Sequence, residues 1–273
     1  MPVATNNHLG HSGETYPDAF YVRLGDDRFV STLHSQGAWQ PGEQHLAPAS
    51  GLVLAEVERR LPGDKLISRV SFDVLGVIHS GEFTIDVEIV RPGRSIELVE
   101  ACMRHGDRVS IRARIWRLAP GDTTPVHGIE WMPLPPPDAM RHLAFSSIWG
   151  GGYIDSLEAR QDDNARPGRG CSWIRTRYPL VQGETDPPVA GFLKLIDTAN
   201  GLVVREDPRS VFFANVDLTV HFFRQPTAGW VGFDTRVNFG STGLGETFSV
   251  LSDIHGPLGT AAQSLTVRLG VPG

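Results

Sequence analysis

The most regular pattern in the chain is the alternation of apolar and polar residues over short runs. Residues 83–89 read Phe-Thr-Ile-Asp-Val-Glu-Ile, and residues 109–116 read Val-Ser-Ile-Arg-Ala-Arg-Ile-Trp. Successive side chains of a strand point to opposite faces, so this pattern predicts strands with one buried and one polar face. A large part of the chain is therefore expected to form antiparallel sheet.

Two other segments carry apolar residues at helical spacing. In residues 46–60 the apolar stripe begins at Leu46 and continues through Ala49, Val53 and Val57, and Pro62-Gly63 follows the segment. Residues 187–200 carry a similar stripe, preceded by Asp186 and closed by Asn200-Gly201. Each segment is predicted to form one helix, because a capping residue or a Pro-Gly pair marks its end.

The two predicted helices occupy corresponding places in a repeated order of elements. In each half two strands precede the helix and several strands follow it. The expected strands are residues 20–24, 29–33, 69–78, 83–89, 96–103 and 109–116 in the first half, and 153–159, 172–180, 216–224, 230–239, 248–253 and 261–269 in the second. This order predicts an α+β protein of two similar domains, residues 15–120 and 143–273, joined by a Pro-rich linker at 121–142.

Composition narrows the class of protein. The net charge of −6 argues against a nucleic-acid-binding protein, which would carry a basic face. Cys102 and Cys171 form no metal-binding motif, and no nucleotide- or cofactor-binding motif is present. The N-terminal residues show no signal peptide, and no apolar run is long enough to span a bilayer. We therefore expect a cytoplasmic protein with no metal, no cofactor and no membrane insertion.

Several segments resemble the bacterial acyl-CoA thioesterase II family. They are residues 191–201 (Gly-Phe-Leu-Lys-Leu-Ile-Asp-Thr-Ala-Asn-Gly), 215–226 (Asn-Val-Asp-Leu-Thr-Val-His-Phe-Phe-Arg-Gln-Pro), 229–231, 253–263, 71–76 and 81–94. The resemblance covers most of the chain except the termini and the linker, and it lies in the ordered set of motifs. It implies a double hotdog fold, in which each half wraps an antiparallel sheet around one long helix. It also implies hydrolysis of acyl-CoA to free acid and CoA by direct attack of water.

The resemblance implies a water-binding triad of Asp, Thr or Ser, and Gln in the second half. Asp217 matches the acid and Gln263 matches the amide. Counting from Trp230 places Asn238 at the third position, with Ser241 or Thr242 as alternatives if the alignment slips. Asn238 departs from the family pattern, although an amide can also donate and accept hydrogen bonds.

Two other parts of the chain bear on where the site lies. In the first half the position that corresponds to Gln263 falls at Arg112 or Ala113, so one site per chain is expected. Asp197 also invites a catalytic interpretation, because some hotdog enzymes carry an acid on this helix. Its place in the last turn instead favours an ordinary polar residue at a helix end.

Substrate contacts are expected from three further residues. His45 precedes the first helix, whose free N–H groups could stabilise an oxyanion, and Arg69 and Arg224 are candidates for binding the CoA phosphates. The expected partner is a small-molecule acyl-CoA, and the family resemblance makes a homodimer plausible. Two alternatives stay open: a hotdog enoyl-CoA hydratase or dehydratase, and a non-catalytic acyl-CoA-binding protein.

Overall fold

A computed structural model describes residues 17–270 of the chain. Its main feature is one sheet of 13 strands in the order β1-β2-β4-β5-β6-β3-β11-β14-β13-β12-β9-β8-β7. The N-terminal residues that lack a signal-peptide pattern lie outside the described residues. Within residues 17–270 no helix has the length and apolar character needed to cross a membrane.

The first half of the sheet is formed by six strands, which are β1 (Tyr21–Arg23), β2 (Arg28–Ser31), β3 (Leu66–Val74), β4 (Glu82–Arg91), β5 (Ile96–His105) and β6 (Arg108–Leu118). The short helix η1 (Leu33–Ser35) and the long helix α1 (Leu46–Arg60) lie between β2 and β3. The linker and the start of the second half contain short elements, which are η2 (Thr124–Val126), η3 (Pro137–Ala139), β7 (Arg141–His142) and η4 (Phe145–Ser147).

The second half supplies the remaining strands of the sheet, which are β8 (Leu157–Gln161), β9 (Arg169–Thr176), β11 (Asp217–Phe222), β12 (Val231–Phe239), β13 (Leu244–Asp253) and β14 (Gly256–Thr266). Its helices are α2 (Gly152–Asp155), α3 (Pro188–Leu193), η5 (Ile196–Thr198) and α4 (Ala199–Leu202). A separate two-stranded sheet pairs β10 (Val211–Phe212) with β15 (Arg268–Leu269).

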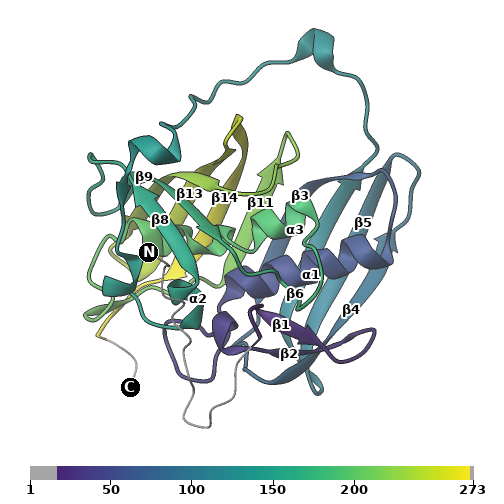
Figure 1. Ribbon diagram of the computed structural model, residues 1–273, viewed down its shortest axis with the longest axis horizontal. Coiled ribbons are helices and arrows are strands. Elements are labelled where there is room, and N and C mark those ends of the chain that lie inside the picture. Colours follow the sequence, from purple (N-terminus) through teal and green to yellow (C-terminus); the bar gives the residue numbers. More distant parts are fainter. Residues whose placement is uncertain (1–16, 271–273) are drawn as a thin grey trace, which may run out of the picture.

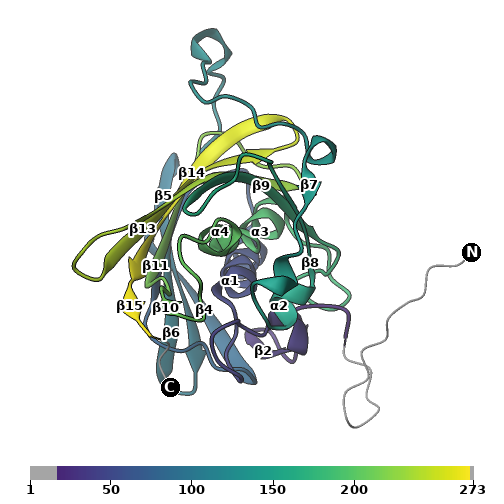
Figure 2. The same ribbon diagram turned by 90° about the vertical axis from the view of Figure 1, so that its left-hand side faces the viewer.

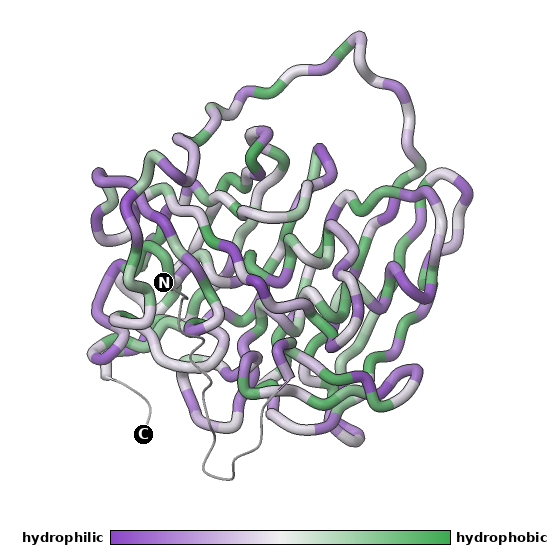
Figure 3. Tube along the Cα trace, viewed as in Figure 1, coloured by the Kyte–Doolittle hydropathy of each residue, from purple (hydrophilic) through white to green (hydrophobic). Residues whose placement is uncertain are grey.

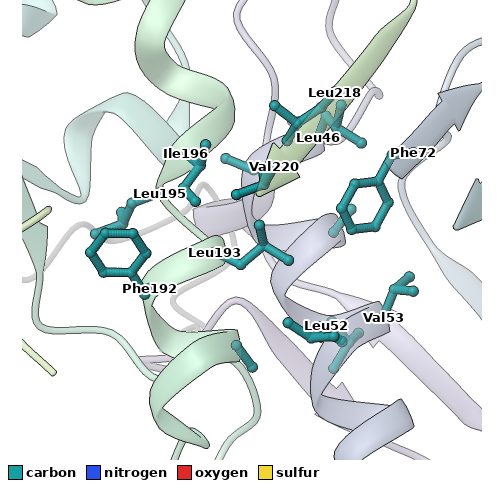
Figure 4. Packing of buried hydrophobic residues seen from close by; sticks show 14 of the residues in the cluster. Leu46, Leu52, Val53, Phe72, Phe192, Leu193, Leu195, Ile196, Leu218 and Val220 are labelled. Atoms are coloured by element: carbon teal, nitrogen blue, oxygen red, sulfur yellow. The ribbon is translucent and has the colours of Figure 1, made fainter. Parts of the chain in front are cut away.

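The sheet curves around the helices, which lie inside it (Figure 2). Apolar and polar residues alternate along the strands (Figure 3), as the sequence pattern predicts. The inward residues of both halves form one buried cluster with α1 and α3, in which Phe72, Leu193 and Val220 pack together (Figure 4). The α+β double hotdog expected from the resemblance is the observed architecture.

The two halves meet at the antiparallel pair β3–β11, which we call the seam. Ser71 of β3 lies opposite Thr219 of β11. Backbone hydrogen bonds therefore run across the boundary between the halves without interruption. The linker, in contrast, arcs away from the body of the molecule between β6 and η3 (Figure 1).

The second helix differs from its prediction. Residues 187–200 form α3, then η5 and α4, with the helix interrupted at Lys194 and Leu195. The Lys194 ammonium reaches back to the Asp186 carboxylate at 2.5 Å and to the Tyr178 carbonyl oxygen at 2.7 Å. An apolar stripe predicts which side is buried, but it does not show such a break.

The strand predicted at residues 153–159 was also only partly right. The segment starts as the helical turn α2, and the strand β8 begins at Leu157. Tyr153 in this turn is fully buried and its hydroxyl contacts the Thr198 hydroxyl at 2.7 Å. The two buried side chains of this turn, Tyr153 and Ile154, gave the segment an apolar character that resembles a strand.

Candidate active site

A buried carboxylate, Asp197 of η5, lies at the centre of a cluster of polar side chains. It is 3% exposed. Its Oδ1 accepts a hydrogen bond from Nδ2 of Asn215 at 2.7 Å and another from Nε2 of Gln263 at 2.8 Å. Both amides use the same oxygen, so Oδ2 is left for another donor. A buried acid with two fixed amide donors is an arrangement suited to holding a water molecule.

The strand β14 places Gln263 on the inner face of the sheet, where it is 2% exposed. Asn215 reaches the same face through an irregularity next to β11. Thr219 pairs with Ala262, and Asn215 pairs with Leu265, so four steps along one strand span three steps along the other. This one-residue bulge reverses the alternation and turns Asn215 inward.

His45 approaches Asp197 from the other half of the molecule. It is the N-cap residue of α1, and its Nδ1 accepts a hydrogen bond from the backbone N–H of Ala47 at 3.1 Å. The neutral ring therefore carries its proton on Nε2. Nδ1 lies 3.5 Å from Oδ2 of Asp197, and the ring packs on Tyr153 with centroids 4.3 Å apart.

Burial controls the charge of both groups. Burial raises the pKa of the Asp197 carboxyl to about 7, against the opposing hydrogen bonds from Asn215 and Gln263. Burial also lowers the pKa of the His45 imidazole to about 3. The short contact between them is therefore not an ion pair near neutral pH, because the imidazole is uncharged there. The cluster holds an acid that changes charge near neutral pH beside an imidazole that is uncharged there.

The structure does not bring Asp217 into this cluster, contrary to the predicted triad. Its register with β3 and β14 places its side chain on the outer face of the sheet, where Oδ1 accepts the backbone N–H of Ser264 at 2.5 Å. Regular alternation with the buried Leu218 directs Asp217 outward, and the bulge before it brings Asn215 to the inner face instead. Asp217 touches the site only through its backbone oxygen, which accepts Nδ2 of Asn215 at 2.9 Å.

The predicted third member of the triad also lies elsewhere. Asn238 is exposed on β12 opposite Glu246, whereas its neighbour Val237 lies opposite Thr247, the partner of Gln263. Residues directly opposite each other share a face, so Asn238 points away from Gln263. Ser241 and Thr242 are exposed in the turn after β12. None of the three meets the Asp197 cluster.

Of the two arginines expected to bind the CoA phosphates, Arg69 and Arg224, the second already forms an ion pair with a buried carboxylate. Nη1 and Nη2 of Arg224 bond the two carboxylate oxygens of the buried Asp253 at 2.8 and 2.7 Å. Arg224, with other hydrogen bonds, holds the pKa of that carboxyl at about 2. Arg69 lies on β3 opposite His221 of the seam. The Arg224 charge is thus already paired in a structural contact.

Sequence reasoning identified Asp197 but favoured an ordinary helix-end residue. The local signal was mixed, because Asp197 follows the apolar Leu195 and Ile196 but has Lys194 and Asn200 at helical spacing. The role of Asn215 gave no comparable signal, because a bulge cannot be read from alternation. The corresponding place in the first half holds the buried Ala113, which has no amide to offer.

Two family models match the chain over nearly its whole length. They are the acyl-CoA thioesterase N-terminal domain at residues 35–118 and the acyl-CoA thioesterase C-terminal domain at residues 120–267. The fold and the matches together define a double hotdog thioesterase. The chain belongs to the acyl-CoA thioesterase family, and its reaction is the hydrolysis of acyl-CoA thioesters.

Solved structures show the same fold at low identity. A protein of unknown function with a hot dog fold from Alicyclobacillus acidocaldarius is 17% identical with a TM-score of 0.73, and covers 92% of this chain and 97% of its own. The acyl-CoA thioesterase II TesB2 from Mycobacterium marinum is 15% identical with a TM-score of 0.68, and covers 94% and 97%. A search of curated proteins found no match.

Among the described residues, no three His, Cys, Asp or Glu side chains gather as ligands for a metal ion. The polar groups near Asp197 are two amides, one imidazole and two hydroxyls, those of Tyr153 and Thr198. These groups can orient a water and donate hydrogen bonds to an oxygen. They provide the functions that hydrolysis by direct water attack requires.

Proposed function

We propose that Asp197 is the general base that activates water for attack on the acyl-CoA thioester. The water oxygen bonds to the carbonyl carbon while Asp197 takes a proton from the water. The tetrahedral intermediate then collapses, the C–S bond breaks, and the protonated Asp197 returns its proton to the CoA thiolate. The observation that supports this role is a buried carboxylate whose Oδ1 is fixed by two amides and whose Oδ2 lies toward His45.

Asn215 and Gln263 orient the carboxylate and the water in this proposal. The buried Oε1 of Gln263 has no hydrogen-bond partner within residues 17–270, so a bound water would satisfy it. Asn215 supplies an amide where the family resemblance implies a hydroxyl. An amide donor serves here because Oδ1 of Asp197 needs a donated hydrogen bond.

His45 is the proposed donor to the thioester oxygen. We expected free backbone N–H groups at the start of α1 to do this, but the N–H of Ala47 is already bonded to Nδ1 of His45. The imidazole thereby presents Nε2–H at the positive end of the helix dipole. A neutral donor fixed in place stabilises the oxyanion without reorganisation during the reaction.

Thiol release from acyl-CoA by the Asp197→Asn protein tests this assignment. Positioned general bases contribute roughly 10²–10⁴-fold, so kcat should fall by about that factor while KM changes little. Asp217→Asn is the matched control, since it removes a carboxylate two residues from Asn215 on the outer face. A large loss in Asp217→Asn with normal turnover in Asp197→Asn would contradict the proposal.

The same experiment separates the alternative functions. A hydratase would consume an enoyl-CoA double bond without releasing thiol, and a binding protein would retain acyl-CoA without turnover.

We place the enzyme in cytoplasmic lipid metabolism, where acyl-CoA is available, and we propose a homodimer from the family resemblance. Light scattering during size-exclusion chromatography measures the molar mass in solution and so tests the homodimer.

A further inference from the structure

A small pocket lies next to Asp197 and differs in character at its two ends. It has a volume of about 30 Å³. Its polar lining includes His45, the proposed oxyanion donor, and Thr198, the residue after the proposed base. The rest of the lining is Asn200 and Gly201 together with five apolar or aromatic residues: Ala38, Trp39, Phe145, Trp149 and Ile154. A thioester carbonyl at the polar end would direct its acyl group toward the aromatic residues.

The aromatic end of the pocket is closely packed. Trp39 meets Trp149 edge-on with ring centroids 5.1 Å apart, and it meets Phe213 at 5.6 Å. The indole N–H of Trp149 donates to the backbone oxygen of Gly201 at 3.1 Å. A Cβ on Gly201 would already lie 3.1 Å from Nε1 of Trp149. The aromatic wall formed by Trp39 and Trp149 is therefore tightly packed against the backbone at Gly201.

The wall also lies close to the proposed base. Trp149 is bonded to Gly201, which follows Asp197 by four residues along η5 and α4. Four helical residues rise about 6 Å, so the wall stands roughly one helical turn from the carboxylate. An acyl chain that starts beside Asp197 meets Trp149 after a short extension.

We propose that this pocket receives the acyl group and that Trp39 and Trp149 restrict the enzyme to acetyl-CoA and propionyl-CoA. The inference rests on the proposed function of the Asp197 site. A dry cavity of about 150 Å³ holds benzene, with its six carbons. A space one-fifth as large holds about one carbon on this scale, so the methyl of an acetyl group fits, an ethyl group is at the limit, and longer chains require the tryptophans to move.

The test is the rate of thiol release, as kcat/KM, across a series of straight-chain acyl-CoA substrates from acetyl to dodecanoyl. The wild-type protein should act best on acetyl-CoA or propionyl-CoA. A misfit of one methylene in an apolar pocket changes the rate by about 10–200-fold, so hexanoyl-CoA should react at least about tenfold more slowly. Equal or faster turnover of octanoyl-CoA overturns the proposal.

Two variants should move the preference in opposite directions. Trp39→Ala removes part of the wall and should raise kcat/KM for hexanoyl-CoA relative to acetyl-CoA by about tenfold. Ala38→Leu fills the pocket and should lower the rate on propionyl-CoA relative to acetyl-CoA. Trp131→Ala is the matched control, because Trp131 is 42% exposed in the linker. Its chain-length profile should equal that of the wild type.

The outcomes distinguish this inference from the function on which it rests. If a folded Trp39→Ala protein keeps the wild-type profile, the pocket does not receive the acyl group. Should Trp39→Ala fail to fold, the wild-type profile and the Ala38→Leu variant still decide the point. If no acyl-CoA of any length is hydrolysed, the proposed function itself fails.

Discussion

At the scale of single residues, the chemistry depends on one acid that is neutral or charged according to pH. Asp197 is buried, its pKa is raised to about 7, and only its ionised form can accept a proton from water. We therefore expect kcat/KM to rise with pH through about 7 and to level off above it. Thiol-release rates measured from about pH 5 to pH 9 check this, and a profile that is flat across neutrality would argue against Asp197 as the base.

The same residue should lower the stability of the folded protein above neutral pH. The pKa of Asp197 in the folded protein, about 7, exceeds the ordinary value of 3.8. Its contribution to the free energy of unfolding is therefore fully present below about pH 4 and is lost as pH rises to about 7. Asp197→Asn should thus raise the melting temperature at about pH 8 but not at about pH 4. The expected rise is ~2–4 °C for each kcal/mol gained in the free energy of unfolding. Thermal unfolding at the two pH values tests the sign.

The amide partners should act together on one carboxylate. Removing a hydrogen bond to a charged group costs about 1.5–3 kcal/mol, so Asn215→Ala and Gln263→Ala should each lower kcat by roughly ten- to a hundredfold. The double variant should lose less than the sum in free energy, since both amides bond Oδ1 of Asp197. Asn238→Ala, on the outer face, is the control, and strict additivity would indicate independent roles.

At the scale of elements, the sequence predicts most strands and α1 but not the details that assemble the site. Alternation in residues 83–89 and 109–116 identifies β4 and β6, and helical spacing identifies α1. The bulge at Asn215 and the break at Lys194 come from tertiary contacts that no local pattern encodes. Gln263 was identified through the family resemblance and Asn215 was missed, while Asp217 was assigned to the triad although its alternation with Leu218 points it away from the apolar face.

The seam should be the element on which stability depends most clearly. Phe72 of β3 is 1% exposed in the core shared by both halves, and replacing a buried Phe by Ala costs about 3–5 kcal/mol. Phe72→Ala should lower the denaturant midpoint while unfolding remains a single transition. Phe223→Ala, where the side chain is 53% exposed, should change little. Separate transitions for the two halves would contradict a shared core.

At the scale of the whole molecule, the site is complete only when both halves are present. Asp197, Asn215 and Gln263 come from the second half, and His45 comes from the first. Cutting the chain at a specific protease site inserted between Gly128 and Ile129 should leave activity unchanged, because the seam and the core hold the pieces together. Thiol release and size-exclusion chromatography of the cut protein check this, and separation of the fragments would contradict it.

The linker also affects which two half-molecules pair at the seam. Without the linker, the exposed edge of β3 could pair with the same edge of another first half, giving a particle with Ala113 in place of Gln263 and no Asp197. A short tether holds its two ends at an effective concentration in the millimolar range, far above that of other copies in dilute solution. The linker thus selects the mixed pair over either self-pair when the two halves first come together.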